Sequence, residues 1–162
     1  MIANNRVSGL LICTSLIAAM LLTMQPLPLW LQPFRPAVFV TTVLFWVLMQ
    51  PLRFGITWAW VCGVVLDVLY GTPISQHGLA LALAAYIIVK LRELLWIIPY
   101  WQQPLLLLPV FMVYEFILFW MDGIMGFEVT PLRRWLPVLS SALVWPFLAL
   151  FLERIAEMDV RY

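Results

Sequence analysis

Long hydrophobic runs, separated by short polar or proline-containing segments, account for most of the chain. A membrane-spanning helix needs roughly 17–25 mostly apolar residues, and shorter runs qualify only where their boundaries are loose. Prolines punctuate the connections, as expected where a helix must stop. We predict a single all-α domain over residues 1–162, with six transmembrane helices. These spans lie at about residues 7–24, 36–49, 55–70, 77–89, 104–121 and 136–152.

The composition supports lipid as the solvent. Hydrophobic residues make up 65% of the chain and charged residues 10%, whereas soluble domains carry about 45–50% and about 25%. A net charge of +1 gives no basic stripe of the kind that binds nucleic acid. Cys13 and Cys62 both lie inside apolar runs, so they indicate neither a disulfide framework nor a metal site.

The distribution of lysine and arginine predicts the orientation, because cytoplasmic loops carry the excess of these residues. With six spans the two termini share one side, and that side holds six of the nine basic residues. We therefore predict that both termini are cytoplasmic and that the turn at residues 71–76 faces outward. The segment KLRELLWIIPYWQQ after the fourth span is either a separate interfacial helix or an extension of that span.

Asp67 places a carboxyl group within the third predicted span, near its outer end. Gly63, Asp67 and Gly71 are spaced four apart and share one helical face. Glycine allows a second backbone to approach closely, and the next span offers a matching surface that begins with Gly78. We expect a tight helical hairpin with Asp67 at or near the contact.

Glu115 is a second acid within a predicted span, at a depth comparable with that of Asp67. The two acids could share a proton, bind a cation, or each pair with hydroxyl and backbone amide groups. Intramembrane acids are by default a hypothesis of function. For both residues we favour a structural or assembly role over contact with a ligand or ion.

Other chemistry is sparse. His77, the one histidine, has no cysteine or carboxylate at metal-ligand spacing, so it is interpreted as a residue at a helix start or at the membrane interface. Pro146 should kink the sixth span. Nucleotide-binding, zinc and nucleophile–base motifs do not occur, and the outer loop offers only Asp122, Glu128, Arg133 and Arg134. We predict a protein that is not an enzyme and has no cofactor or metal.

Several motifs, in order along the chain, resemble those of the MreD family, the rod shape-determining membrane proteins of bacteria. The central one is GVVLDVLYGTPISQHGLALALAAYIIVKL, which contains Gly63, Asp67, Gly71 and Gly78. The others are FRP at 34–36, WQQ at 101–103, Glu115 followed by FW at 119–120, and LVWP at 143–146. The resemblance covers essentially the whole chain.

This resemblance implies a scaffold in the bacterial inner membrane that binds the single-span protein MreC. Through MreC it belongs to the elongation machinery, which connects MreB filaments to RodA and its transpeptidase and so links cell shape to peptidoglycan synthesis. MreD-like proteins are also similar in expected fold to the substrate-binding membrane components of vitamin importers. The alternative is therefore a transporter component with a small-molecule or lipid pocket near Asp67. Self-association and contacts with membrane lipids are left open.

Overall fold

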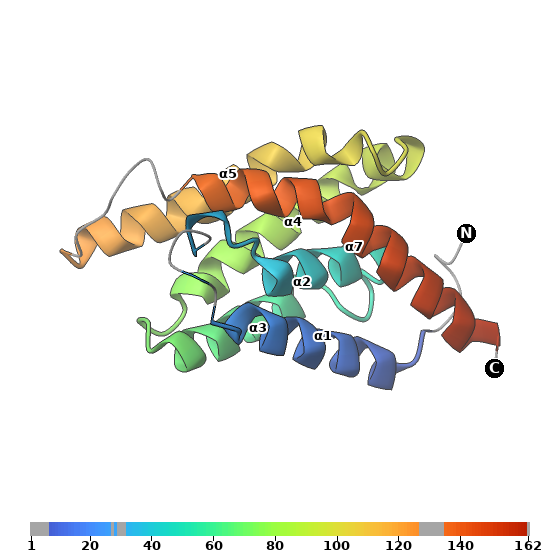
Figure 1. Cartoon of the computed structure of the whole chain (residues 1–162), viewed down its shortest axis with the longest axis horizontal. Helices are drawn as coiled ribbons and strands as arrows, with labels where there is room; N and C mark the ends of the chain where they lie inside the picture. Colours follow the sequence, from blue (N-terminus) through green and yellow to red (C-terminus); the bar gives the residue numbers. More distant parts are fainter. Residues whose placement is uncertain (1–6, 27, 29–31, 127–134, 162) are drawn as a thin grey trace.

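The computed structural model describes residues 7–26, 28, 32–126 and 135–161. Throughout these residues the regular structure is helical, without strands, as predicted (Figure 1). The elements are α1 (Gly9–Met24), the short 3₁₀ helix η1 (Gln32–Phe34), α2 (Val38–Met49), α3 (Ile56–Tyr70), α4 (Gln76–Ile97), α5 (Gln103–Ile124) and α7 (Leu136–Arg161).

Helices α4 and α7 extend well beyond the hydrophobic runs that predicted them. Helix α4 continues through the charged KLREL stretch to Ile97, so this stretch is an extension of the helix. Helix α7 continues past residue 152 to Arg161. Apolar runs mark the depth of the membrane, whereas a helix ends where its backbone hydrogen bonds end. No proline interrupts α4 before Pro99, and the charged residues at its end are good helix formers.

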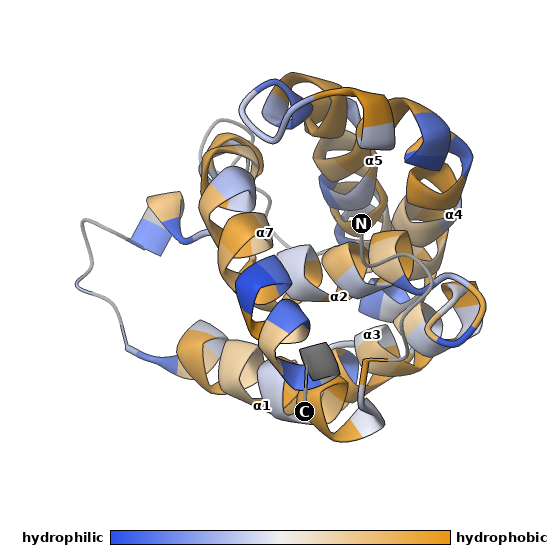
Figure 2. Ribbon diagram, turned by 90° about the vertical axis from the view of Figure 1, so that its right-hand side faces the viewer, coloured by the Kyte–Doolittle hydropathy of each residue, from blue (hydrophilic) through white to orange (hydrophobic). Residues whose placement is uncertain are grey.

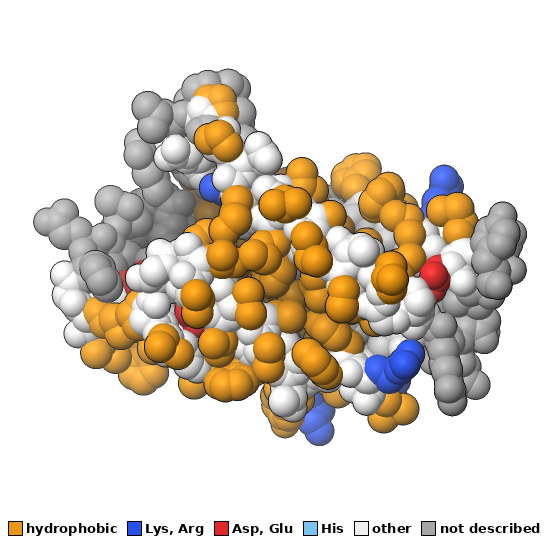
Figure 3. Space-filling view, turned by 90° about the horizontal axis from the view of Figure 1, so that it is seen from below, with side chains coloured by type: hydrophobic (Ala, Val, Ile, Leu, Met, Phe, Trp, Pro, Cys, Tyr) orange, Lys and Arg blue, Asp and Glu red, His pale blue; other side chains and the backbone are white. Residues whose placement is uncertain are grey.

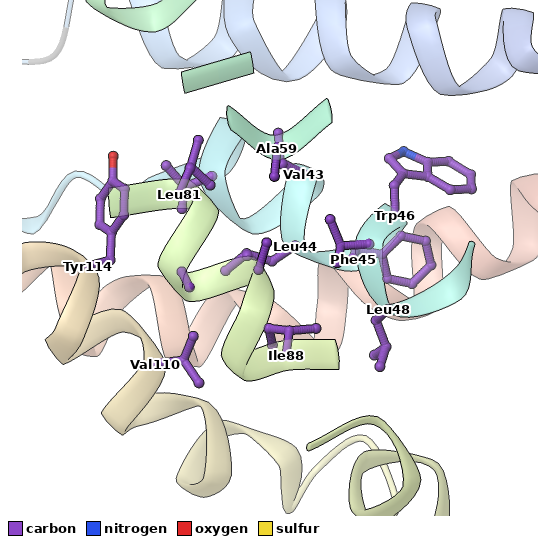
Figure 4. Close-up of a cluster of buried hydrophobic side chains, with 14 of the residues drawn as sticks. Val43, Leu44, Phe45, Trp46, Leu48, Ala59, Leu81, Ile88, Val110 and Tyr114 are labelled. Carbon is purple, nitrogen blue, oxygen red and sulfur yellow. The ribbon is translucent and has the colours of Figure 1, made fainter. Parts of the chain in front are cut away.

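Helix α2 is the centre of the bundle. It packs against α1, α3, α4 and α7, and it lies among them when the bundle is viewed end-on (Figure 2). Every residue from Phe39 to Leu48 is buried, and several of these side chains form the cluster drawn in Figure 4. The hydroxyl groups of Thr41 and Thr42 donate to the carbonyls of Ala37 and Val38, so their polarity is satisfied within the helix. A helix that is apolar on all sides requires this central position.

Large hydrophobic side chains also cover the outside of the bundle. Leu105 is 78% exposed, Phe147 77% and Val68 70%. On the face shown in Figure 3, hydrophobic side chains spread over the middle, and the few charged side chains lie toward the periphery. Soluble monomers rarely expose apolar patches of this extent, so the surface indicates a membrane protein.

Among the described residues, α5 and the segment Leu136–Asp159 of α7 are long and apolar enough to cross a membrane. Helices α1, α2 and α3 are apolar but shorter, and α4 carries three charged residues in its second half. The number of transmembrane helices therefore stays a prediction.

The two ends of the bundle differ in their polar contacts. At one end, which we call the terminal end, the Ser8 backbone N–H and hydroxyl donate to the Asp159 carboxylate at 2.7 and 2.9 Å. At the other, the turn end, the Gln76 side-chain amide donates to Asp122 at 2.7 Å, which joins the start of α4 to the end of α5. The contact between Ser8 and Asp159 thus brings the start of α1 beside the end of α7.

Candidate functional site

The turn between α3 and α4 brings the sequence-predicted residues of the central motif together. Asp67 lies in the last turn of α3, and its side chain is completely buried. The helix ends at Gly71, whose left-handed backbone (φ 65°) a residue with a side chain rarely adopts. The backbone N–H groups of Gly71 and Thr72 both donate to the Asp67 carbonyl and close the helix end.

The carboxyl group of Asp67 caps the start of α4. Its Oδ1 atom accepts from the Thr72 hydroxyl at 2.9 Å and from the His77 backbone N–H at 2.9 Å, and Oδ2 accepts from the Gly78 N–H at 3.3 Å. The first N–H groups of a helix have no partner within the helix, and a negative group near them is stabilising. Asp67 therefore supplies from α3 the cap that α4 needs.

The residue that would normally provide this cap has a different partner. Ser75 precedes α4 in a left-handed conformation (φ 77°) and makes no side-chain cap. Its hydroxyl instead accepts from the Trp60 indole N–H at 3.1 Å. Capping by a side chain from another helix explains how a carboxyl group is accommodated in an otherwise apolar hairpin.

His77 is the residue whose role was not predicted from the sequence. Its Nδ1 atom lies 2.7 Å from Asp67 Oδ1, and its ring lies between those of Tyr70 and Tyr114, at 5.6 and 6.4 Å between centroids. The sequence predicts for it only a place at a helix start or at the membrane interface, and it does occupy the start of α4. The sequence feature that indicates this contact is the short connection between α3 and α4, which places the first turn of α4 beside the last turn of α3.

The glycines allow the α3 and α4 backbones to touch. A Cβ atom at Gly63 would lie 2.5 Å from the Gly78 Cα and 2.6 Å from the His77 carbonyl oxygen. A Cβ atom at Gly78 would meet Val64 at 3.0 Å and Trp60 at 3.3 Å. These two helices form the most extensive helix–helix contact in the described structure. Gly63 is needed for space, whereas Gly71 is needed for its backbone conformation.

Glu115 lies in α5 and lines a cavity of about 250 Å³ near the turn end. The cavity also includes Arg35, Tyr70, His77 and Tyr114. Asp67 is not one of the lining residues. The structure therefore brings Glu115 and His77 to one cavity and assigns Asp67 to the hairpin.

The WQQ and LVWP motifs meet toward the terminal end. Trp145 of the LVWP motif donates its indole N–H to Gln103 Oε1 of the WQQ motif at 2.7 Å, and both side chains are buried. The amide of Gln103 in turn donates to the carbonyls of Leu95 and Ile98, where α4 ends. Pro146 follows Trp145 within α7, whose ribbon changes direction along its length (Figure 1). Both motifs are visible in the sequence, but the pairing of Gln103 with Trp145 is not.

No group of three or more histidine, cysteine, aspartate or glutamate side chains in the described part of the chain could hold a metal ion. Glu128, Arg133 and Arg134 of the outer loop lie outside the described residues.

The central helix of this bundle is apolar on all sides, and the exterior of the bundle is apolar as well. These features are typical of an integral membrane protein. The family model for rod shape-determining protein MreD matches residues 4–155. The chain belongs to this family. It is also 27% identical over 139 residues to a rod shape-determining protein MreD of Haemophilus influenzae, with 86% of each chain covered. No solved structure matches the protein.

Proposed function

We propose that this protein is a non-enzymatic scaffold of the machinery that elongates rod-shaped bacterial cells. It spans the inner membrane six times, with both termini in the cytoplasm, and it binds MreC. Family membership supports a role in rod shape determination. The structural observation that supports the scaffold assignment is the hydrogen bonding of the buried acid Asp67. Asp67 accepts hydrogen bonds on both oxygens from the adjacent turn and helix, so it is committed to holding two helices together.

The α3–α4 hairpin forms part of the surface that MreC recognises. Close packing at Gly63 and Gly78 gives the hairpin one fixed geometry. Its outer faces carry exposed apolar side chains, including Val68 and Leu79. In a membrane, helices associate through shape complementarity and small residues, since lipid tails are as apolar as leucine. MreC then connects the scaffold indirectly to MreB, RodA and its transpeptidase.

Co-purification tests this proposal. The tagged protein is expressed with MreC from the same bacterium, extracted in mild detergent and captured. We expect MreC in a fixed ratio to the scaffold, both with its full chain and with its membrane segment alone. Capture of an unrelated single-span protein at the same level, or no capture of MreC, would contradict the proposal.

A second candidate function is a membrane component that binds a small molecule or lipid for import. The cavity beside His77 and Glu115 favours this alternative. Saturable uptake of a vitamin that depends on this chain and an ATPase would establish it. The scaffold proposal predicts no such uptake.

A further inference from the structure

A second cavity lies at the terminal end, remote from the turn between α3 and α4. It has a volume of about 310 Å³ and is formed where α2 and α4 end. We call it the head cavity. Its lining includes Met49, Trp96, Tyr100 and Glu153.

The head cavity attracts positive charge. The carboxylate of Glu153 lines it, and α2 and α4 end at it with their carbonyl groups, the negative ends of the helix dipoles. Burial, together with the hydrogen bond from its hydroxyl to Glu153, raises the pKa of Tyr100 well above its ordinary value. Tyr100 therefore stays neutral, and its hydroxyl remains a donor to Glu153.

An apolar crevice of about 720 Å³ lies on the other side of Ile98, which lines both spaces. We call it the tail crevice. It lies between the start of α5 and α7 and is lined mainly by hydrophobic residues, including Leu105, Ala142 and Leu143. Ala142 and Glu153 are three turns apart on α7 (about 16 Å at 1.5 Å per residue) and share a face. The polar end of the combined site is therefore at the terminal end, and the apolar part runs toward the middle of the bundle.

A cation lies beside the head cavity as well. The Arg92 guanidinium is 5.7 Å from the centre of the Trp96 ring, which lines the cavity. The Nε atom of Arg92 is buried without a hydrogen-bond partner among the described residues. Arg92 does not line the cavity itself, but it places a positive group directly beside Trp96, which does.

We propose that the head cavity and the tail crevice together bind one phospholipid with a primary ammonium headgroup, phosphatidylethanolamine. Its ammonium group donates to Glu153, its phosphate lies toward Arg92, and an acyl chain occupies the tail crevice. This goes beyond the scaffold function. It uses the proposed orientation only to assign the lipid to the cytoplasmic leaflet.

The test is lipid retention by the purified full-length protein, measured by native mass spectrometry. The micelles contain equal amounts of phosphatidylethanolamine, phosphatidylcholine and phosphatidylglycerol with identical acyl chains. Phosphatidylcholine keeps the charge but lacks every N–H donor. Only phosphatidylethanolamine can donate a charge-assisted hydrogen bond to Glu153, and such bonds are among the stronger ones in proteins, so we expect about a tenfold preference for it over phosphatidylcholine.

Glu153→Gln should abolish this preference, and Glu93→Gln, which changes an exposed acid of α4 outside the cavity, should preserve it. Leu143→Trp fills the tail crevice and should lower retention of all three lipids. Leu10→Trp, at an equally exposed position on α1, should not. Equal retention of the three lipids by the unmodified protein would overturn the proposal, as would a preference for phosphatidylglycerol.

If Glu153→Gln does not fold, the lipid preference of the unmodified protein and the Leu143→Trp and Leu10→Trp pair still decide the outcome. MreC co-purification is measured separately. If the protein binds MreC but retains the three lipids equally, the proposed lipid site is overturned and the scaffold proposal is not affected.

Discussion

The contact between Gly63 and Gly78 is the tightest constraint at the scale of single residues. The missing side chains allow the α3 and α4 backbones to touch. The spacing of Gly63, Asp67 and Gly71, together with the matching surface that begins at Gly78, was enough to predict a close hairpin. The partners of Asp67 could not be predicted, since the identity of the cap depends on the left-handed turn at Ser75, which leaves the Ser75 hydroxyl to Trp60.

Gly63→Ala should therefore prevent normal packing of the hairpin. The added methyl group would lie 2.5 Å from backbone atoms that cannot move independently, and overpacking typically costs about 1–3 kcal/mol. We expect a lower thermal unfolding temperature in detergent and less protein in the membrane. Gly123→Ala is the matched control, because it is also in a helix but would meet nothing within 4 Å. Equal stability of both variants would refute the close contact.

Asp67→Leu should destabilise the turn between α3 and α4, because it removes the cap of α4. It leaves the His77 and Gly78 N–H groups without their acceptor, and an unsatisfied buried group costs about 1–3 kcal/mol. Limited proteolysis of the turn in membrane vesicles measures the effect as faster cleavage. Cleavage at the unmodified rate would show that the cap contributes little.

At the scale of elements, the hydrophobic runs of the sequence predicted the helices but not all of their ends. The apolar run ends near residue 89 and leaves open whether the next segment is a separate helix or an extension, and α4 continues to Ile97 because its last turns retain good helix formers. The junction that terminates α4 involves Gln103 and Trp145, which are 42 residues apart in sequence. No local pattern reports such a pairing, so the sequence revealed the two motifs without their connection.

Gln103→Leu should loosen this junction. The change removes the acceptor of the buried Trp145 indole and the donor to the Leu95 and Ile98 carbonyls. We expect a loss of about 2–3 kcal/mol in unfolding free energy, larger than for an average hydrogen bond because buried partners are left unpaired. Gln102→Leu, at an exposed neighbouring position, is the control.

A double-mutant cycle separates the pair from its surroundings. Combined with Trp145→Phe, Gln103→Leu should cost less than the sum of the two single changes. Strict additivity would show that the Gln103–Trp145 hydrogen bond does not couple α5 to α7.

At the scale of the whole molecule, the all-helical class and the family could be predicted from composition, run lengths and motif order, whereas the six-span layout stays a prediction. The contact of Ser8 with Asp159 places the start of α1 and the end of α7 at one end of the bundle. This arrangement requires an even number of crossings if the bundle is inserted end-on. The orientation relative to the membrane rests on the basic residues alone.

Reporter fusions test this orientation. A reporter that is active only in the cytoplasm should be active at the carboxyl terminus and inactive when inserted in the 71–76 turn. Activity of a periplasmic reporter at the carboxyl terminus would contradict the six-span topology.

The central claim is that Asp67 supports cell shape by holding the hairpin together, not by carrying a charge or proton. Asp67→Asn is the most direct test, since an amide oxygen can still accept from Thr72 and the His77 N–H. The measurement is the length-to-width ratio of cells whose only copy is this variant, at matched membrane level and MreC co-purification. We predict rod-shaped cells with near-normal MreC binding. Round cells containing a fully assembled Asp67→Asn complex would contradict the account.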